Sequence, residues 1–210
     1  MFKDTCYIFA AGDFNGKFSR KEKDFIIAAD AGCRHLEKNG VIPDLLIGDF
    51  DTIGQVPNVC ETITFPCEKD YTDTELAIME AIKRGYNAFI ICGALGGKRI
   101  EHTVANIKLC ESYAIKGYDI TLTDGNYFVK SIHNSKIEFS DDEKGFISVF
   151  SLSGKAEGVT IKGLKYTLEN AFLDFSNPTL CVSNEFIGTK STVSVDNGTI
   201  TIIWERKDIE

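Results

Sequence analysis

The sequence predicts an α/β fold in two parts: an N-terminal α/β/α domain with an open, mostly parallel sheet, and a C-terminal antiparallel β-sandwich or barrel. Short apolar runs alternate with helical patterns in the first half, which is typical of parallel sheets covered by helices. From about Asn126, segments rich in Ile, Val, Thr and Phe follow one another between turns, as they do in antiparallel sandwiches and barrels. We place the boundary in the polar stretch around Asn134 to Lys144, which gives domains at 1–133 and 140–210.

Local signals define each element of the first part. We expect strands at 6–11, 25–29, 45–47, 61–65, 88–92 and 119–123, and helices at 31–38, 73–85 and 102–116. Asn39-Gly40 ends the first helix. Thr72 followed by Glu75 matches a capping box, which predicts that the second helix begins near Asp73.

The second part contains short β-type segments. We expect strands at 146–152, 159–161, 180–182, 192–195 and 199–203. Asn197-Gly198 separates the last two, and this dipeptide is the strongest short hairpin signal in the chain.

Composition excludes several classes of protein. The chain has 210 residues and a formal net charge of −8, which argues against a broad surface for nucleic acid or an anionic membrane. Seven cysteines occur without a Cys-x-x-Cys pair, so we interpret them as small core residues rather than a disulfide framework or a zinc site. No apolar run approaches the length that spans a membrane. We therefore expect a cytoplasmic protein.

Asp49 and Asp51 form the first candidate site. They follow the buried strand expected at 45–47, and residues two apart in an extended backbone point the same way. Two converging carboxylates repel each other unless a cation lies between them. Oxygen ligands of this kind suit Mg²⁺, which also binds substrate phosphates. A solvated acidic turn is the alternative interpretation.

The glycine-rich segment 93–99 forms the second candidate site. It reads Gly-Ala-Leu-Gly-Gly-Lys-Arg, in which glycines admit close backbone approach and two cations, Lys98 and Arg99, follow. It is not a Walker A loop, because its spacing is too short and no Ser or Thr follows Lys98. Asp30, Asp49 and this segment all follow expected strands. Ligands of open α/β sheets bind outside the carboxyl ends of the strands.

Two pairs of residues flank these segments. His102 and Asn106 are four residues apart and so share a helix face, where they are candidate phosphate or ribose ligands. Asp70 and Asp73 lie at a helix start, where carboxylates commonly cap backbone N–H groups. Their position near the expected crevice makes at least one of them a candidate metal ligand or base.

Six motifs in order resemble those of the thiamine pyrophosphokinase family. They lie at 28–32, 43–52, 69–75, 96–106, 163–166 and 182–186. The chain departs from the family pattern in the glycine loop, where Lys98 is an extra residue and Glu101 replaces an aspartate. Both Lys98 and Arg99 are therefore candidates for the phosphate contact.

The resemblance implies an activity and an assembly. The activity is Mg²⁺-dependent transfer of pyrophosphate from ATP to the hydroxyl of thiamine, which gives thiamine diphosphate and AMP. The N-terminal domain would bind nucleotide and metal, and the β-domain would contribute to the thiamine site. The assembly would be a homodimer with active sites shared between subunits.

The resemblance also implies roles for individual residues. The matches to the family's catalytic and metal-binding positions are Asp49, Asp51 and Asp73. The matches to its ATP site are Asp30, Lys98, Arg99, His102 and Asn106. Ser183 and Asn184 match its thiamine site, although from the residues alone they are ordinary turn formers. We hypothesise that Asp73 orients or deprotonates the thiamine hydroxyl.

Three alternatives have similar acidic sites. A pyrophosphokinase acting on another heterocyclic alcohol, such as a pterin, would differ mainly in its β-domain, and the Ser183-Asn184 motif favours thiamine. A non-catalytic sensor would be expected to lose the metal carboxylates, which are all present here. A metal-dependent phosphohydrolase would consume ATP without thiamine.

Overall fold

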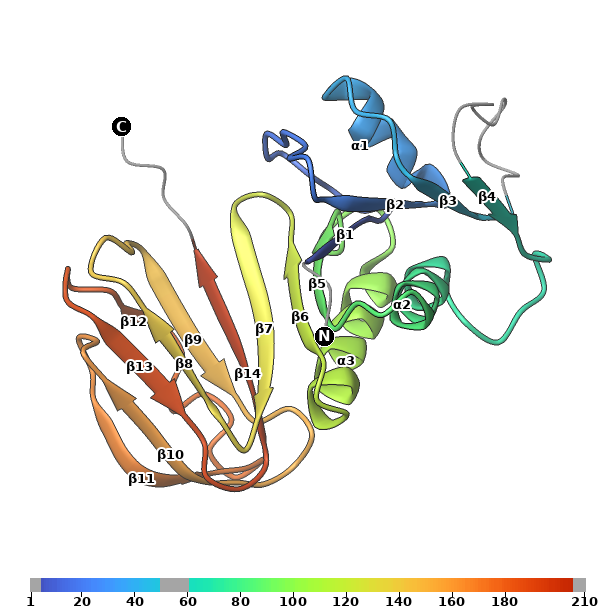
Figure 1. Cartoon of the computed structure of the whole chain (residues 1–210). Coiled ribbons are helices and arrows are strands. Elements are labelled where there is room, and N and C mark those ends of the chain that lie inside the picture. Colours follow the sequence, from blue (N-terminus) through green and yellow to red (C-terminus); the bar gives the residue numbers. More distant parts are fainter. Residues whose placement is uncertain (1–4, 50–60, 206–210) are drawn as a thin grey trace. The chain divides into compact units, whose positions relative to one another are not determined.

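The computed structural model describes residues 5–49 and 61–205, and contacts divide the chain into two units (Figure 1). Residues 1–109 and 119–125 form the first unit, and residues 110–118 and 126–210 form the second. The strand Tyr127–His133 (β7) belongs to the second unit. It pairs along its whole length with Thr199–Glu205 (β14), so this division lies before the 134–144 stretch in which we expected the boundary.

Parallel strands form the sheet of the first unit. They are β1 (Cys6–Phe9), β2 (Phe25–Ala29), β3 (Leu45–Gly48), β4 (Glu61–Thr64), β5 (Ala88–Cys92) and β6 (Asp119–Thr123). Their order is β6-β5-β1-β2-β3-β4, and all five neighbouring pairs are parallel. The predicted parallel sheet is confirmed. The chain adds strands to one side of β1 up to β4 and then returns to its other side with β5.

The helices begin close to their predicted positions, and the last of them has its final residues in the second unit. A 3₁₀ turn, η1 (Asp30–Gly32), leads into α1 (Cys33–Lys38), and α3 spans Ile100–Ile115. The helix α2 spans Asp73–Lys83, and its N-cap Thr72 accepts a hydrogen bond from the Glu75 N–H at 3.2 Å. The predicted cap is therefore confirmed.

Both faces of this sheet are covered. Figure 1 shows α1 on one side of β1, β2 and β3 and α2 on the other. Alternate residues of a strand face opposite sides, and one apolar cluster joins one face of the sheet to α1. Its buried members are Phe9, Ile26, Ala28, Cys33, Leu36, Leu46 and Cys92.

Two antiparallel layers form the second unit. The first has the order β12-β9-β14-β7 and adds β12 (Asn184–Glu185) and β9 (Phe146–Phe150) to β14 and β7. The second has the order β11-β10-β13-β8 and contains β11 (Leu168–Leu173), β10 (Ala156–Lys162), β13 (Ser191–Ser194) and β8 (Lys136–Phe139). One buried cluster draws on both layers, with Ile147 and Ile202 from the first and Val159 and Val193 from the second. The predicted β-sandwich is confirmed.

The hairpin predicted at Asn197-Gly198 is wrong. The strands on either side of it, β13 and β14, lie in different sheets and pair with other strands. The Gly198 N–H donates to Asn134 Oδ1 at 2.7 Å, and the Asn197 N–H donates to the Glu157 carbonyl at 3.1 Å. The dipeptide therefore turns the chain from one layer to the other.

The strand predicted at 180–182 is also wrong, because these residues form a turn. The Leu180 N–H donates to the Asn177 carbonyl at 3.2 Å, and the Val182 N–H donates to the Thr179 carbonyl at 3.3 Å. These local bonds occupy the donors that a sheet partner would need.

Five of the described cysteines are buried: Cys6, Cys33, Cys92, Cys110 and Cys181. Burial raises the pKa of Cys92 to about 12, so this side chain stays a thiol at neutral pH and acts as a core residue. Cys67 is exposed, and the core interpretation is wrong for that residue. Cys60 lies outside the described residues.

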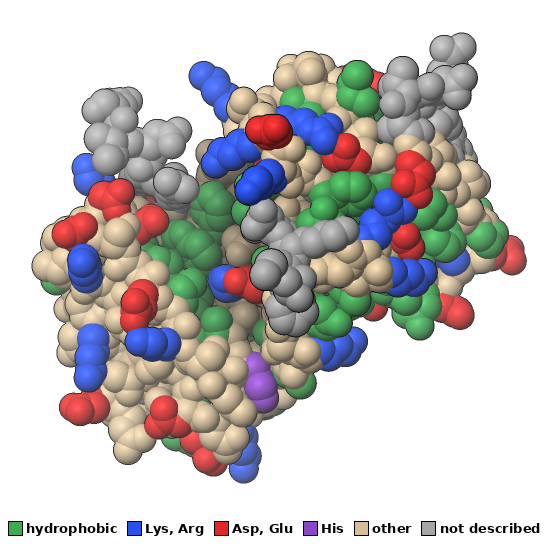
Figure 2. Space-filling model, in the orientation of Figure 1, with side chains coloured by type: hydrophobic (Ala, Val, Ile, Leu, Met, Phe, Trp, Pro, Cys, Tyr) green, Lys and Arg blue, Asp and Glu red, His purple; other side chains and the backbone are tan. Residues whose placement is uncertain are grey.

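The surface of the second unit has mixed charge on the face shown in Figure 2, where basic and acidic side chains are interspersed. Within residues 5–49 and 61–205, no helix combines the length and the apolar character needed to cross a membrane.

Candidate active site

A cleft of about 670 Å³ lies in the first unit at the carboxyl ends of β1, β2 and β5. The strand order reverses between β1 and β5, and such a switch point is where open α/β sheets bind ligands. The volume is within the range of small-molecule sites. Six predicted site residues line this one cleft: Asp30, Asp73, Lys98, Arg99, His102 and Asn106.

The loops after β1 and β5 approach each other closely at the cleft. The Gly12 N–H donates to the Gly93 carbonyl at 2.8 Å. A Cβ atom at Gly12 would lie 2.6 Å from that carbonyl oxygen, and Gly93 has a positive φ of 69°. Both positions therefore require glycine. His35 Nε2 lies 2.8 Å from the Gly12 carbonyl, so this nitrogen carries the proton and donates.

Asp13 connects the two loops through its side chain. Its Oδ2 accepts a hydrogen bond from the Gly97 N–H at 2.7 Å, and its own N–H donates to the Leu95 carbonyl at 3.1 Å. Gly96 and Gly97 have positive φ values of 69° and 82°. Glycine adopts this conformation without steric cost, and the Gly97 N–H is thereby directed to the Asp13 carboxylate. Sequence reasoning did not single out Asp13, because its partner lies 84 residues away.

His102 and Asn106 reach the cleft from α3, as their four-residue spacing predicted. Asn106 is 5% exposed, and its Nδ2 donates to the Ala94 carbonyl at 2.8 Å. Asn106 thereby holds the glycine segment against the helix.

Lys98 and Arg99 are both exposed, but a carboxylate pairs with the charge of Arg99 and not with that of Lys98 among the described residues. The Nε of Arg99 donates to Glu101 Oε1 at 2.7 Å, and this bond lowers the pKa of the Glu101 carboxyl. In the described part of the chain no carboxylate pairs with Lys98. Lys98 therefore presents the less compensated cation at this edge of the cleft.

Asp30 directly follows β2 and has a positive φ of 46°. This conformation is uncommon for a residue other than glycine, and such strain is concentrated at functional sites. The backbone of Gly48 lies close to Asp30, and a Cβ atom at position 48 would lie 3.2 Å from the Asp30 Cα.

Asp49 and Asp73 converge on the ammonium group of Lys69. The Lys69 Nζ lies 2.7 Å from Asp73 Oδ1 and 3.8 Å from Asp49 Oδ2. The side chains of Lys69, Asp49 and Asp73 are 14%, 18% and 26% exposed. Burial alone would lower the pKa of Lys69, but the hydrogen bond to Asp73 and the two negative charges outweigh burial and raise it. Sequence reasoning gave Lys69 no role, because this residue precedes α2 and its contacts with Asp49 and Asp73 depend on the path of an irregular segment.

Asp51 lies outside the described residues. Within the described ranges, no three His, Cys, Asp or Glu side chains form a group suited to a metal ion. The two described carboxylates of the predicted metal site, Asp49 and Asp73, share the ammonium group of Lys69.

Ser183 and Asn184 lie in the second unit. Ser183 has a positive φ of 59°, and its N–H donates to Ser148 Oγ at 3.0 Å. Asn184 is 5% exposed. Its Oδ1 accepts from the Tyr166 N–H at 3.0 Å, and its Nδ2 donates to the Tyr166 carbonyl at 2.7 Å. Asn184 thus holds the backbone of Tyr166, whose side chain is 62% exposed.

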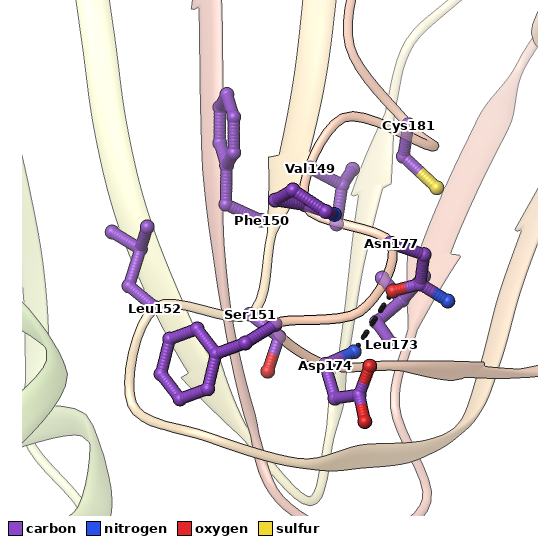
Figure 3. A pocket seen from close by; sticks show the side chains of 10 residues that line it. Val149, Phe150, Ser151, Leu152, Leu173, Asp174, Asn177 and Cys181 are labelled. Atoms are coloured by element: carbon purple, nitrogen blue, oxygen red, sulfur yellow. Dashed lines mark hydrogen bonds between the residues drawn. The ribbon is translucent and has the colours of Figure 1, made fainter.

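A smaller pocket of about 100 Å³ lies in the second unit between the β9 end and the 174–181 turn (Figure 3). Its walls include Val149, Leu173 and Cys181, and Asn177 Oδ1 accepts from the Asp174 N–H at 2.9 Å. This volume is below the usual range of ligand sites, roughly 300–1,000 Å³. None of the predicted site residues lines it.

Comparison with known proteins assigns the two units. Residues 19–122 match the family model "Thiamin pyrophosphokinase, catalytic domain", and residues 134–200 match "Thiamin pyrophosphokinase, vitamin B1 binding domain". A thiamine pyrophosphokinase of Bacillus subtilis is 30% identical over 184 residues, which cover 84% of this chain and 85% of that protein. The chain belongs to the thiamin pyrophosphokinase family.

Solved structures of thiamin pyrophosphokinases agree over nearly the whole chain. The Bacillus subtilis thiamine pyrophosphokinase superposes with a TM-score of 0.85 at 27% identity and covers 98% of this chain and 100% of that one. A thiamin pyrophosphokinase family protein from Enterococcus faecalis gives 0.82 at 29% identity, with coverage of 97% and 99%. The chain is accordingly an enzyme of thiamine diphosphate synthesis that acts by pyrophosphoryl transfer.

Proposed function

We propose that this cleft binds ATP together with Mg²⁺. The enzyme then transfers the pyrophosphoryl group of ATP to the hydroxyl of thiamine and releases AMP. One observation supports this above all. Six residues assigned from the sequence to ATP and catalysis line a single cleft at the switch point of the sheet, in a chain of the thiamin pyrophosphokinase family.

The proposed phosphate site lies at the glycine loops. Glycines at 93, 96 and 97 allow phosphate oxygens to approach the backbone, and Lys98 has no described carboxylate partner. We assign the principal phosphate contact to Lys98 and a secondary one to Arg99, whose charge Glu101 partly compensates. His102 and Asp30 complete the proposed nucleotide site, and Asn106 supports the loop.

The residues present fit a divalent cation. Asp49 and Asp73 already converge on one cationic group, and Asp51 is two residues from Asp49. These three carboxylates would hold Mg²⁺, which when bound supplies charge neutralisation to the phosphates.

The remaining roles belong to the chain's own groups. Transfer of this kind depends on positioning and charge more than on covalent help. Asp73 orients the thiamine hydroxyl or takes its proton, and Ser183 and Asn184 contribute to the thiamine site, Asn184 by fixing Tyr166. We also propose a cytoplasmic homodimer with shared active sites.

The test is AMP formation by the purified protein with Mg²⁺ and ATP, with and without thiamine. Thiamine-dependent AMP and an equal amount of thiamine diphosphate are expected. Asp49→Ala should abolish both, whereas Asp141→Ala, at an exposed turn of the second unit, should abolish neither. AMP formed only with a pterin or another alcohol would show that this alcohol, and not thiamine, is the substrate. Phosphate release without any acceptor would indicate a phosphohydrolase, and thiamine binding without turnover a sensor.

A further inference from the structure

Lys69 is the one cationic side chain within salt-bridge distance of both Asp49 and Asp73 among the described residues. All three side chains are partly buried, with exposures of 14% to 26%. Lys69 lies in the irregular segment between β4 and α2, and its four-carbon stem is flexible. The ammonium is thus firmly paired, yet it is carried by a side chain that can turn away.

An ammonium and a divalent cation compete for these oxygens. Asp73 Oδ1 already accepts a hydrogen bond from the Lys69 ammonium, with an N···O distance of 2.7 Å. A metal ion held by the same carboxylates would share their oxygens with this ammonium. Like charges brought together in this way repel strongly even with partial screening. Conversely, two carboxylates without any cation repel each other.

We propose that Lys69 is an internal counter-ion, which holds Asp49 and Asp73 together in the metal-free enzyme and gives up this position when the metal binds. The inference rests on the metal site of the proposed function. It assigns to Lys69 a positioning role: the lysine keeps the site assembled but weakens metal binding, because each metal ion must displace it.

The experiment measures Mn²⁺ binding in the absence of nucleotide and thiamine, by electron paramagnetic resonance of the free ion. Lys69→Met removes the competing charge, so we expect it to bind Mn²⁺ about tenfold more tightly than the wild type. The matched control is Lys83→Met. Lys83 pairs with Glu80 on the exposed side of α2, so this variant changes net charge equally and should bind as the wild type does.

The double variant Lys69→Met/Asp49→Ala locates the effect. It should not bind Mn²⁺ more tightly than the wild type does, because the metal then lacks one of the two carboxylates. If Lys69→Met does not fold, Lys69→Gln replaces it, since glutamine is neutral and still donates hydrogen bonds.

Unchanged or weaker Mn²⁺ binding by the Lys69 variant would overturn the proposal, and so would a gain that survives in the double variant or appears equally in Lys83→Met. Undetectable binding in every variant would also contradict it. Thiamine-dependent AMP formation by the wild type would in those cases leave the proposed function standing. A gain in Mn²⁺ affinity without AMP formation would instead support the counter-ion and refute the function.

Discussion

The carboxylate of Asp13 accepts the backbone N–H of Gly97 at 2.7 Å, which joins the loop after β1 to the glycine segment after β5. The contact lies at the switch point of the sheet. A side chain thus helps to shape the part of the cleft to which we assign the phosphates.

Asp13→Ala should raise KM for ATP about three- to tenfold with a smaller effect on kcat, because the loop loses a charge-assisted hydrogen bond. Asp13→Asn should restore most of the affinity, since its amide oxygen can accept the same N–H. Steady-state kinetics at saturating thiamine measures both. Asp24→Ala is the control, because Asp24 accepts the Lys21 N–H at 2.7 Å in a turn that does not line the cleft. A lower KM in Asp13→Ala would show instead that the carboxylate competes with phosphate.

Asp73→Asn should lower kcat by about 100-fold or more if the carboxylate acts on the thiamine hydroxyl, given the usual contribution of general acid–base catalysis. The change keeps the size of the side chain and an oxygen able to accept from Lys69. The measurement is kcat across a range of pH with folding checked by circular dichroism. Retention of most wild-type kcat at every pH would exclude Asp73 as the base.

Thr72→Ala should lower the free energy of unfolding by about 1 kcal/mol, because the Glu75 N–H at the start of α2 loses its acceptor. Thr72→Ser should keep most of the stability, since serine also caps helices. Urea denaturation compares the three proteins. Equal midpoints for the alanine variant and the wild type would mean that this cap is not a net stabiliser.

The ion pair of Glu61 with Arg84 predicts a dependence of stability on pH. The hydrogen bond from Arg84 holds the pKa of the Glu61 carboxyl below its ordinary value, so the folded state favours the ionised form. The contribution of this ion pair to the free energy of unfolding is present above the unfolded-state pKa of Glu61. It disappears as the pH falls through the lower folded-state pKa. Because Glu61 is 52% exposed, we expect at most about 1 kcal/mol.

The check for this pair is the difference in unfolding free energy between wild type and Glu61→Gln. That difference should be largest near neutral pH, shrink in acid and decrease with added salt. A difference that grows in acid would contradict the assigned direction of the pKa shift.

Local patterns in the chain sufficed for most of the first unit. The strands predicted at 25–29, 88–92 and 119–123 have these bounds in the structure. The first two are continuous apolar runs, as buried parallel strands often are, and the third alternates polar residues with Ile120 and Leu122. The cap at Thr72 depends on two residues that are three apart. The shared helix face of His102 and Asn106 depends on a spacing of about one helical turn. Such relationships are visible without knowing the fold.

Contacts between distant segments were decided only by the tertiary structure. Asn197-Gly198 has the composition of a hairpin, but β13 and β14 find better partners in separate sheets. The roles of Asp13 and Lys69 likewise depend on groups brought together by the sheet: Gly97 for Asp13, and Asp49 for Lys69. Sequence determines which residues favour a strand, a turn or a charge at each position. Which of them meet depends on burying both faces of a sheet at once, and that is a property of the whole chain.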